Sequence, residues 1–324
     1  MLLSDYITQV QFLLHDQTNA DFTQSELTNQ INDARVAVSL DFHCCRQAYL
    51  SPAANAPNPS LYAPVSTIQN QEIYPLNGAN GQNGIVVGAN VLSGGSGYSP
   101  ATTVTFGSGP TGFVQATGVP VIASGVITGI NMTAWGTGYN PAFPTTSPSA
   151  QQPPTVTIAD VGGGTGAIAT ATMFNNVFNV LSISYLWGNQ RYMLRYRGFS
   201  LFQAYMRSQL FFTQRGLIWT IHEQMGYVLI QPPPDQNYVT EWDVLCTPLP
   251  LLNPGDTDTQ IVQPWSDAVQ YYAAYKCLLK LQNFQQAEFM LKLYSARVPK
   301  IIIGAGGVRI PNPYHKTFQR RVSR

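Results

Sequence analysis

Three carboxylates in the C-terminal half of the chain are spaced so that they could perform acid–base chemistry. Asp235 follows three prolines, and Glu241 and Asp243 lie two residues apart in an alternating segment, which places them on one face of a strand. Two carboxyls about 5–9.5 Å apart in a cleft could hydrolyse a glycoside, so a cell-wall hydrolase is one hypothesis. We favour a structural interpretation, in which Asp235 belongs to a turn and the other two carboxylates face solvent.

Histidine and cysteine side chains could offer a second kind of chemistry, metal binding. His43, Cys44 and Cys45 are consecutive in the sequence. Three consecutive side chains rarely face one ion, so we interpret this segment as a buried helix end and expect no metal and no cofactor. The four cysteines form no CxxC pair, which favours reduced, mostly buried thiols and assembly in cytoplasm.

A long segment in the middle of the chain is almost free of charge, since Asp160 is the only charged residue between Ile73 and Gln190. This segment also repeats itself. GSGY at 95–98 recurs as GTGY at 136–139, and TVTF at 103–106 recurs as TVTI at 155–158. Short β-branched runs separated by glycine predict two copies of a small β unit. The GxG motifs lack the pattern of a phosphate-binding loop, so we interpret them as turns.

The segments on either side of this insertion have ordinary charged, amphipathic sequence. TQSE at 23–26 is a capping box that starts a helix, and Phe22 and Leu27 can form the hydrophobic staple around it. Apolar periodicity predicts the other elements. We expect helices over 4–14, 23–43, 200–212, 265–282 and 284–298, the last stopped by Pro299, and strands over 178–185, 218–222, 227–230 and 238–245.

Together these elements predict an α+β protein with a discontinuous body. We expect a helical-bundle body with a small β-hairpin element over residues 1–76 and 177–298. Residues 77–176 are predicted to form an inserted all-β repeat domain, and residues 299–324 an extended C-terminal arm, because they contain many Gly and Pro and few large apolar residues.

The arm is strongly basic, with no acidic residue after Glu288, so we expect it to contact a partner. Acidic protein surface and DNA are the two candidate partners, the second through its phosphates. A neighbouring subunit is expected against Tyr271, Tyr272 and Tyr275, which cover more than one face of their helix. The proposed contact residues of the arm are Ile301, Ile302, Ile303, Val308, Ile310, Tyr314, Phe318, Arg320, Arg321 and Arg324.

The order of the flanking elements resembles the head-to-tail adaptor (connector, or tail accessory) proteins of tailed bacteriophages, most closely those of short-tailed phages. The resemblance rests on LSDYITQVQFLLHD and FTQSELTNQINDAR at the start, then STIQNQEIYPL, YVLIQPPPDQNYVTEWDV and DTDTQIVQPWSDAVQYYAAYKCLLKLQN. It covers roughly 1–76 and 177–324. It implies a homo-oligomeric ring, most often of twelve subunits, with no cofactor and no catalysis.

The same resemblance implies the partners. The C-terminal arm would bind the portal protein, the ring would present a platform for a tail nozzle or hub protein, and genome DNA would pass through the lumen without sequence-specific binding. The protein would belong to the virion, at the head–tail junction. The sequence contains no run of about twenty apolar residues, so it predicts no membrane span. The N-terminal residues do not predict a signal peptide.

Two further hypotheses stand beside the adaptor. The inserted β domain could be a host-surface or carbohydrate-binding module on a virion appendage, which a shallow groove lined by Tyr98, Trp135 and Tyr139 would favour. The other hypothesis is the cell-wall hydrolase, which would use Glu241 and Asp243 as its two carboxyls. Composition favours a ring subunit, because only 10% of the residues are charged and a ring hides much uncharged surface.

Overall fold

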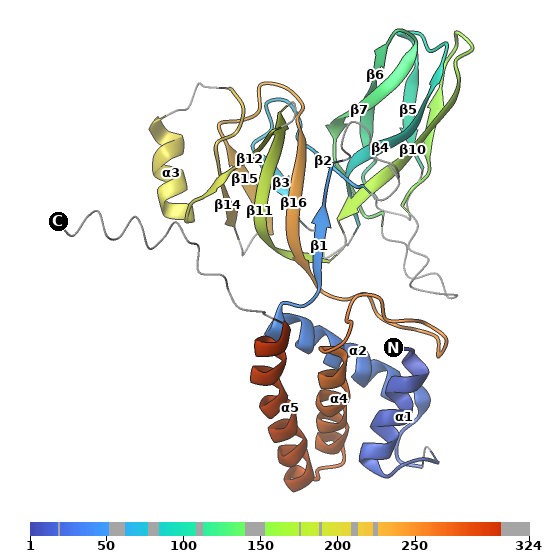
Figure 1. Ribbon diagram of the computed structural model, residues 1–324, viewed down its shortest axis with the longest axis vertical. Helices are drawn as coiled ribbons and strands as arrows, with labels where there is room; N and C mark the ends of the chain where they lie inside the picture. Colours follow the sequence, from blue (N-terminus) through green and yellow to red (C-terminus); the bar gives the residue numbers. More distant parts are fainter. Residues whose placement is uncertain are drawn as a thin grey trace, which may run out of the picture. The chain divides into compact units, whose positions relative to one another are not determined.

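The computed structural model describes residues 1–18, 20–51, 62–76, 84–107, 113–139, 153–174, 176–187, 190–208, 213–222 and 226–305. The chain divides into two compact units, which are described separately. The helical unit combines both ends of the chain, residues 1–44 and 250–324. The β unit is the continuous stretch between them, residues 45–249 (Figure 1).

The helical unit is a bundle of α1 (Leu3–Leu14), α2 (Gln24–Phe42), α4 (Ser266–Lys280) and α5 (Phe284–Ala305). Helix α4 packs against each of the other three, as Figure 1 also shows. Small residues of α4 make this close packing possible, because Ala268, Ala273 and Cys277 are fully buried. They meet the apolar stripes of α1 and α2, to which Val10 and Ile31 belong.

The start of α2 follows the sequence prediction. The Thr23 hydroxyl accepts the amide of Glu26 at 3.3 Å, and the Glu26 carboxylate accepts the amide of Thr23 at 3.1 Å, so the capping box is confirmed. Phe22 and Leu27, on either side of this cap, are buried in the same core. Local hydrogen bonding and packing therefore fix where this helix begins.

The predicted end of the last helix is wrong. Helix α5 continues through Pro299 to Ala305. A proline removes one backbone hydrogen bond from a helix, but the rest of the turn can still hold the helical path. Ile301, Ile302 and Ile303 accordingly lie in α5 rather than in an extended arm. Residues 306–324, with the remaining proposed contact residues of the arm, lie outside the described residues.

The β unit contains two sheets built from the segments that flank the insertion. The first has the order β1-β16-β11-β12, with β2 added to β16, and the second has the order β13-β14-β15-β3. Helix α3 (Phe199–Ser208) packs against β14. The strands are β1 (Arg46–Tyr49), β2 (Val65–Ser66), β3 (Ile73–Pro75), β11 (Val177–Trp187), β12 (Gln190–Met193), β13 (Arg195–Tyr196), β14 (Ile218–His222), β15 (Tyr227–Gln231) and β16 (Val239–Cys246).

The repeat segment adds two more sheets, of order β10-β4-β8 and β7-β6-β5-β9. The two sequence copies pair reciprocally: β4 with β10, β7 with β6, and β5 with β9. The tyrosines of the repeated motif are exchanged in the same way. These strands are β4 (Ile85–Ser96), β5 (Thr103–Phe106), β6 (Thr117–Ala123), β7 (Val126–Ala134), β8 (Gly136–Thr137), β9 (Val156–Ala159) and β10 (Thr165–Phe174).

The repeat segment shares its hydrophobic core with the flanking sheets. The Trp135 ring lies 5.0 Å from Tyr74, 5.8 Å from Phe174 and 6.3 Å from Trp242, measured between ring centroids. Its indole nitrogen donates a hydrogen bond of 3.0 Å to the carbonyl oxygen of Ser66. One tryptophan therefore joins the repeat segment to strands from both flanking sheets.

The fold-class prediction of a helical-bundle body is wrong. The protein is mostly β, with 39% strand and 27% helix. The flanking segments 45–76 and 177–249 pair with each other into sheets and pack on the repeat segment, because a single strand or hairpin cannot bury its apolar face alone. The observed boundaries between the units, after Cys44 and before Pro250, differ accordingly from 76/77 and 176/177.

Candidate functional site

The centre of the helical unit is a buried ion pair between Arg35 of α2 and Asp258, which precedes α4. Their side chains are 1% and 0% exposed. The Asp258 carboxylate also accepts the Tyr6 hydroxyl and the backbone amide of Ile261. Burial and the Asp258 charge raise the pKa of Tyr6, which stays protonated. The fixed charge thus positions three segments of the bundle around one carboxylate.

The chain returns to the helical unit through a second set of polar contacts. The Asn32 side chain both donates to the carbonyl oxygen and accepts from the amide of Leu251, at 2.8 Å each. The amide of Leu3 donates to the carbonyl oxygen of Asp256 at 3.0 Å. The N-terminal helix and the segment before α4 are therefore joined by backbone hydrogen bonds as well as by charge.

The outside of this bundle carries large apolar side chains. Phe12 of α1 and Phe284 of α5 are each 65% exposed, and Phe289 of α5 is 58% exposed. Val36 and Leu40 of α2, one helical turn apart, are also exposed. Exposed aromatic side chains are typical of surfaces that bind another protein. These helix faces are the candidate contact surface of the unit.

The three tyrosines proposed as subunit contacts make much of their contact within the same chain. Tyr272 packs on Tyr294 and Tyr275, with ring centroids 5.1 and 5.7 Å apart. The Tyr271 hydroxyl accepts a hydrogen bond of 2.6 Å from Arg297, whose guanidinium also lies over the ring. All three tyrosines keep some exposed surface. Their part in a subunit interface stays a prediction.

The carboxylates considered for hydrolysis are already bound to arginines. The Glu241 carboxylate accepts hydrogen bonds from Nε and Nη2 of Arg191, at 2.6 and 3.0 Å, and from the backbone amide of Ser51. Asp243 accepts two hydrogen bonds from Arg46, one of them at 2.6 Å. These hydrogen bonds occupy the carboxylate oxygens that would have to transfer a proton. This arrangement performs a structural role, and Glu241, which was expected to face solvent, is buried at 6% exposure.

The aromatic residues proposed to line a sugar-binding groove are buried. Tyr98, Trp135 and Tyr139 are 7%, 7% and 4% exposed. The Tyr98 hydroxyl accepts the amide of Ala167 and the Tyr139 hydroxyl accepts the amide of Ala116, at 3.0 and 2.7 Å. Each tyrosine of one repeat copy thus binds the backbone of the other copy, at strand β10 or just before strand β6. These rings form the core of the repeat rather than a groove.

The cysteines and histidines do not gather into a site. Cys45, Cys246 and Cys277 are buried, as predicted, and form no disulfide, and burial raises the pKa of Cys246 and of Cys277 to about 12. His43 ends α2 in a left-handed conformation, with φ of 50°. Over the described ranges of the chain, no group of three His, Cys, Asp or Glu side chains could hold a metal ion.

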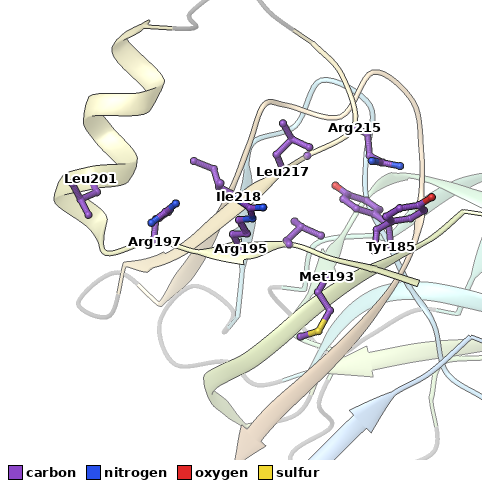
Figure 2. A pocket seen from close by; sticks show the side chains of 11 residues that line it. Tyr185, Met193, Arg195, Arg197, Leu201, Arg215, Leu217 and Ile218 are labelled. Atoms are coloured by element: carbon purple, nitrogen blue, oxygen red, sulfur yellow. The ribbon is translucent and has the colours of Figure 1, made fainter. Parts of the chain in front are cut away.

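A pocket in the β unit was missed by the sequence interpretation. It has a volume of about 650 Å³, and its lining includes three arginines and no carboxylate. Figure 2 shows Arg195 and Arg197 on the segment that contains β13, and Arg215 beside Tyr185. The sequence carried a signal for it: residues 191–215 contain five arginines and no acidic residue, in a chain with few charges.

No protein-family model matches this sequence, and a search of curated proteins finds no match. No helix in the described part of the chain is long and apolar enough to span a membrane.

Proposed function

We propose that this protein is a structural virion protein, a head-to-tail adaptor that assembles as a ring between the portal and the tail of a bacteriophage. The observation that carries the proposal is the helical unit, in which two helices from each end of the chain pack around the buried Arg35–Asp258 pair. Three of the five segments that carry the resemblance to phage adaptors lie in this unit, and the other two lie in the β unit. The β unit is inserted between the two parts of the helical unit.

The surface of the helical unit supports assembly. Phe12, Phe284 and Phe289 are more than half exposed. Side chains of this size are disfavoured on a permanently solvated surface, and contact with a neighbouring subunit would remove them from water at about 25 cal/mol per Å² of buried apolar area. A closed ring satisfies such a surface on every subunit by repeating one heterologous contact.

The partners follow from the same proposal. The C-terminal residues bind the portal, the opposite side of the ring binds a tail nozzle or hub protein, and genome DNA passes through the lumen without sequence-specific binding. The protein acts at the head–tail junction of the virion and is not an enzyme. The arginine pairing of Glu241 and Asp243 supports the last point, because both carboxylates already serve as hydrogen-bond acceptors.

Native mass measurement of the purified chain, alone and mixed with portal, tests the proposal. We expect one closed oligomer, with the twelve copies that are most frequent among phage adaptors, and a defined complex when portal is added. A chain that remains monomeric at high concentration and in the presence of portal would contradict it. The host-surface hypothesis loses its supporting feature, because Tyr98, Trp135 and Tyr139 are buried.

A further inference from the structure

Two of the three arginines that line the pocket of the β unit have no neutralising carboxylate among the described residues. Arg191 and Arg46, outside the pocket, are each paired with a carboxylate, Glu241 and Asp243. Arg195 and Arg197 are exposed and have no ion pair with any described residue. Two guanidiniums beside each other without a counter-charge repel, which a bound anion would relieve.

The third arginine of the pocket is held in place by an aromatic ring. The Arg215 guanidinium lies 4.5 Å from the centroid of the Tyr192 ring. This contact orients the planar guanidinium. Arg215 reaches the pocket from the loop before β14, while Arg195 and Arg197 reach it from β13 and the residue that follows it (Figure 2). The three charges thus converge from two segments.

Tyr185 supplies a buried hydroxyl at this pocket. Its side chain is fully buried and its oxygen has no hydrogen-bond partner among the described residues. The backbone of Gly216 acts on this hydroxyl and lowers its pKa against the larger raising effect of burial, without the geometry of a full hydrogen bond. A buried hydroxyl without a partner is costly, so its presence beside a pocket indicates a partner that the free chain lacks.

The other walls of the pocket are apolar. Met193, Leu201 and Leu217 line it and are 70%, 66% and 40% exposed. Leu194 and Ile218, which also line it, are buried. A ligand that fits must therefore combine anionic groups with an apolar body. Its size is limited to a few side chains by the volume of about 650 Å³.

Two strand edges run along the same pocket. Strand β12 is the outermost strand of one sheet and β13 is the outermost strand of the next, and only Leu194 separates them. Leu194 donates its backbone amide to Ile183 beside β12, whereas Arg195 and Arg197 donate theirs to Leu217 and Trp219 beside β13, so the segment pairs with one sheet and then with the other. Within the described residues β12 and β13 each have a strand partner on one side only. Such an edge can accept an added strand.

We infer that this pocket is a docking site for an acidic segment of a partner protein, bound in extended conformation along residues 192–197. Carboxylates of the segment meet Arg195, Arg197 and Arg215, and its alternate apolar side chains contact Met193 and Leu217. The inference concerns a surface of the β unit and does not depend on ring assembly or on portal binding.

Nucleic acid fits the pocket less well. Protein surfaces that bind nucleic acid are more polar and more uniformly basic, whereas five of the eleven lining side chains here are aliphatic or Met. One face of the Tyr192 ring is covered by Arg215, and the Tyr196 ring packs against Trp219 at 5.0 Å, so stacking surface for bases is limited. Duplex DNA is also too wide to enter the pocket.

Fluorescence anisotropy with the full chain tests the inference. The probe is a short labelled peptide that alternates Glu and Leu, and the comparison peptide has Gln in place of Glu. We expect the Glu peptide to bind and the double variant Arg195→Gln, Arg197→Gln to bind it at least about tenfold more weakly. The matched control is Lys280→Gln, Lys292→Gln, which removes the same charge from two lysines that are 52% and 71% exposed on α4 and α5.

Two further variants separate the contributions. Arg195→Lys, Arg197→Lys keeps the charge but loses the forked donor geometry, and we expect intermediate affinity. Tyr185→Phe removes the hydroxyl without breaking a hydrogen bond of the free chain, and we expect at least about threefold weaker binding with an unchanged thermal midpoint. Unchanged affinity in Tyr185→Phe would remove this residue from the site.

The inference is overturned if the Glu peptide fails to bind, or if the Gln peptide binds equally well. It is also overturned if the lysine control weakens binding as much as the arginine variant, because general charge attraction would then explain the result. A third opposing result is a single-stranded or duplex oligonucleotide that binds more tightly than the peptide and is lost in the arginine variant, which would make the pocket a nucleic-acid site.

Discussion

The guanidinium of Arg35 donates hydrogen bonds from Nε and Nη2 to the two carboxylate oxygens of Asp258, at 2.8 and 2.9 Å, across 223 residues of sequence. Both side chains are buried. The pair therefore joins the N-terminal and C-terminal halves of the helical unit, while the whole β unit lies between them in the sequence.

Replacing Arg35 by Leu should destabilise the helical unit by about 3–5 kcal/mol, because it leaves the Asp258 carboxylate buried without its counter-charge. The double variant Arg35→Leu, Asp258→Leu should recover part of this loss. Denaturant unfolding followed by helical circular dichroism measures both. Lys280→Ala is the control, since it removes a more exposed ion pair with Glu26 and should cost at most about 1 kcal/mol. Equal costs for Arg35→Leu and Lys280→Ala would contradict the central role of the pair.

The surface phenylalanines should control assembly rather than folding. Phe289 is 58% exposed, so Phe289→Ser should leave helical circular dichroism unchanged. If Phe289 contacts a neighbouring subunit, the oligomer of the variant should dissociate at a protein concentration at least about tenfold higher than that of the unchanged chain. Sedimentation velocity measures this concentration. Gln285→Ser, at an exposed position on the same helix, is the control. An oligomer that is unaffected by Phe289→Ser places this face outside the subunit contact.

Trp135 should hold the repeat segment to the flanking sheets. Trp135→Ala removes its contacts with Tyr74, Phe174 and Trp242 and its hydrogen bond to Ser66, and should cost the β unit about 3–5 kcal/mol. Limited proteolysis and near-ultraviolet circular dichroism report on that unit. Val161→Ala, at a side chain that is 94% exposed, should have no measurable effect. A β unit that tolerates Trp135→Ala would mean that the repeat segment folds independently of the sheets beside it.

Asp160 should make the repeat segment sensitive to acid. Hydrogen bonds from the Ser99 hydroxyl and the Gly164 amide lower the pKa of Asp160 from its ordinary value of 3.8 to about 2. Because the folded-state pKa is the lower one, the stabilisation is complete above the ordinary value and is lost as pH falls through about 2. Asp160→Asn should thus lower the thermal midpoint at neutral pH, and this difference from the unchanged chain should shrink toward pH 2.

The comparison for Asp160 is Ser99→Ala, which removes one of the stabilising donors. It should reproduce part of the loss and part of the changed pH dependence. A difference between Asp160→Asn and the unchanged chain that stays constant from neutral pH to pH 2 would exclude the proposed titration.

The C-terminal residues should carry portal binding. Because α5 extends to Ala305, the truncation that spares the helix removes residues 306–324, including Arg320, Arg321 and Arg324. We expect this variant to keep its oligomeric state and to lose portal binding in a pull-down with purified portal. Full portal affinity after truncation would refute the assignment. Loss of salt-sensitive DNA binding alone would instead identify DNA as the partner of these residues.

Local patterns in the sequence were sufficient for the helix start at Thr23, the hairpin of β14 and β15, and the repeated strands β5 and β9. Each depends on interactions between residues close in sequence, or on the side-chain periodicity of a single element. A capping box or an alternating run contains its own signal. The common TVT motif predicted that β5 and β9 are equivalent strands, but only the structure shows that they pair with each other.

The tertiary structure alone decided which elements share a core. The sequence did not indicate that Trp135 packs on Trp242, or that Glu241 pairs with Arg191. Strand pairing and ion pairing across long stretches of chain depend on the path of the intervening segments, which local composition does not encode. The low charge of the repeat segment predicts a domain boundary, yet apolar surface packs on any apolar surface that reaches it. For that reason the helices could be predicted one by one, whereas the mostly β character and the arginine pocket emerged only when the strands were placed together.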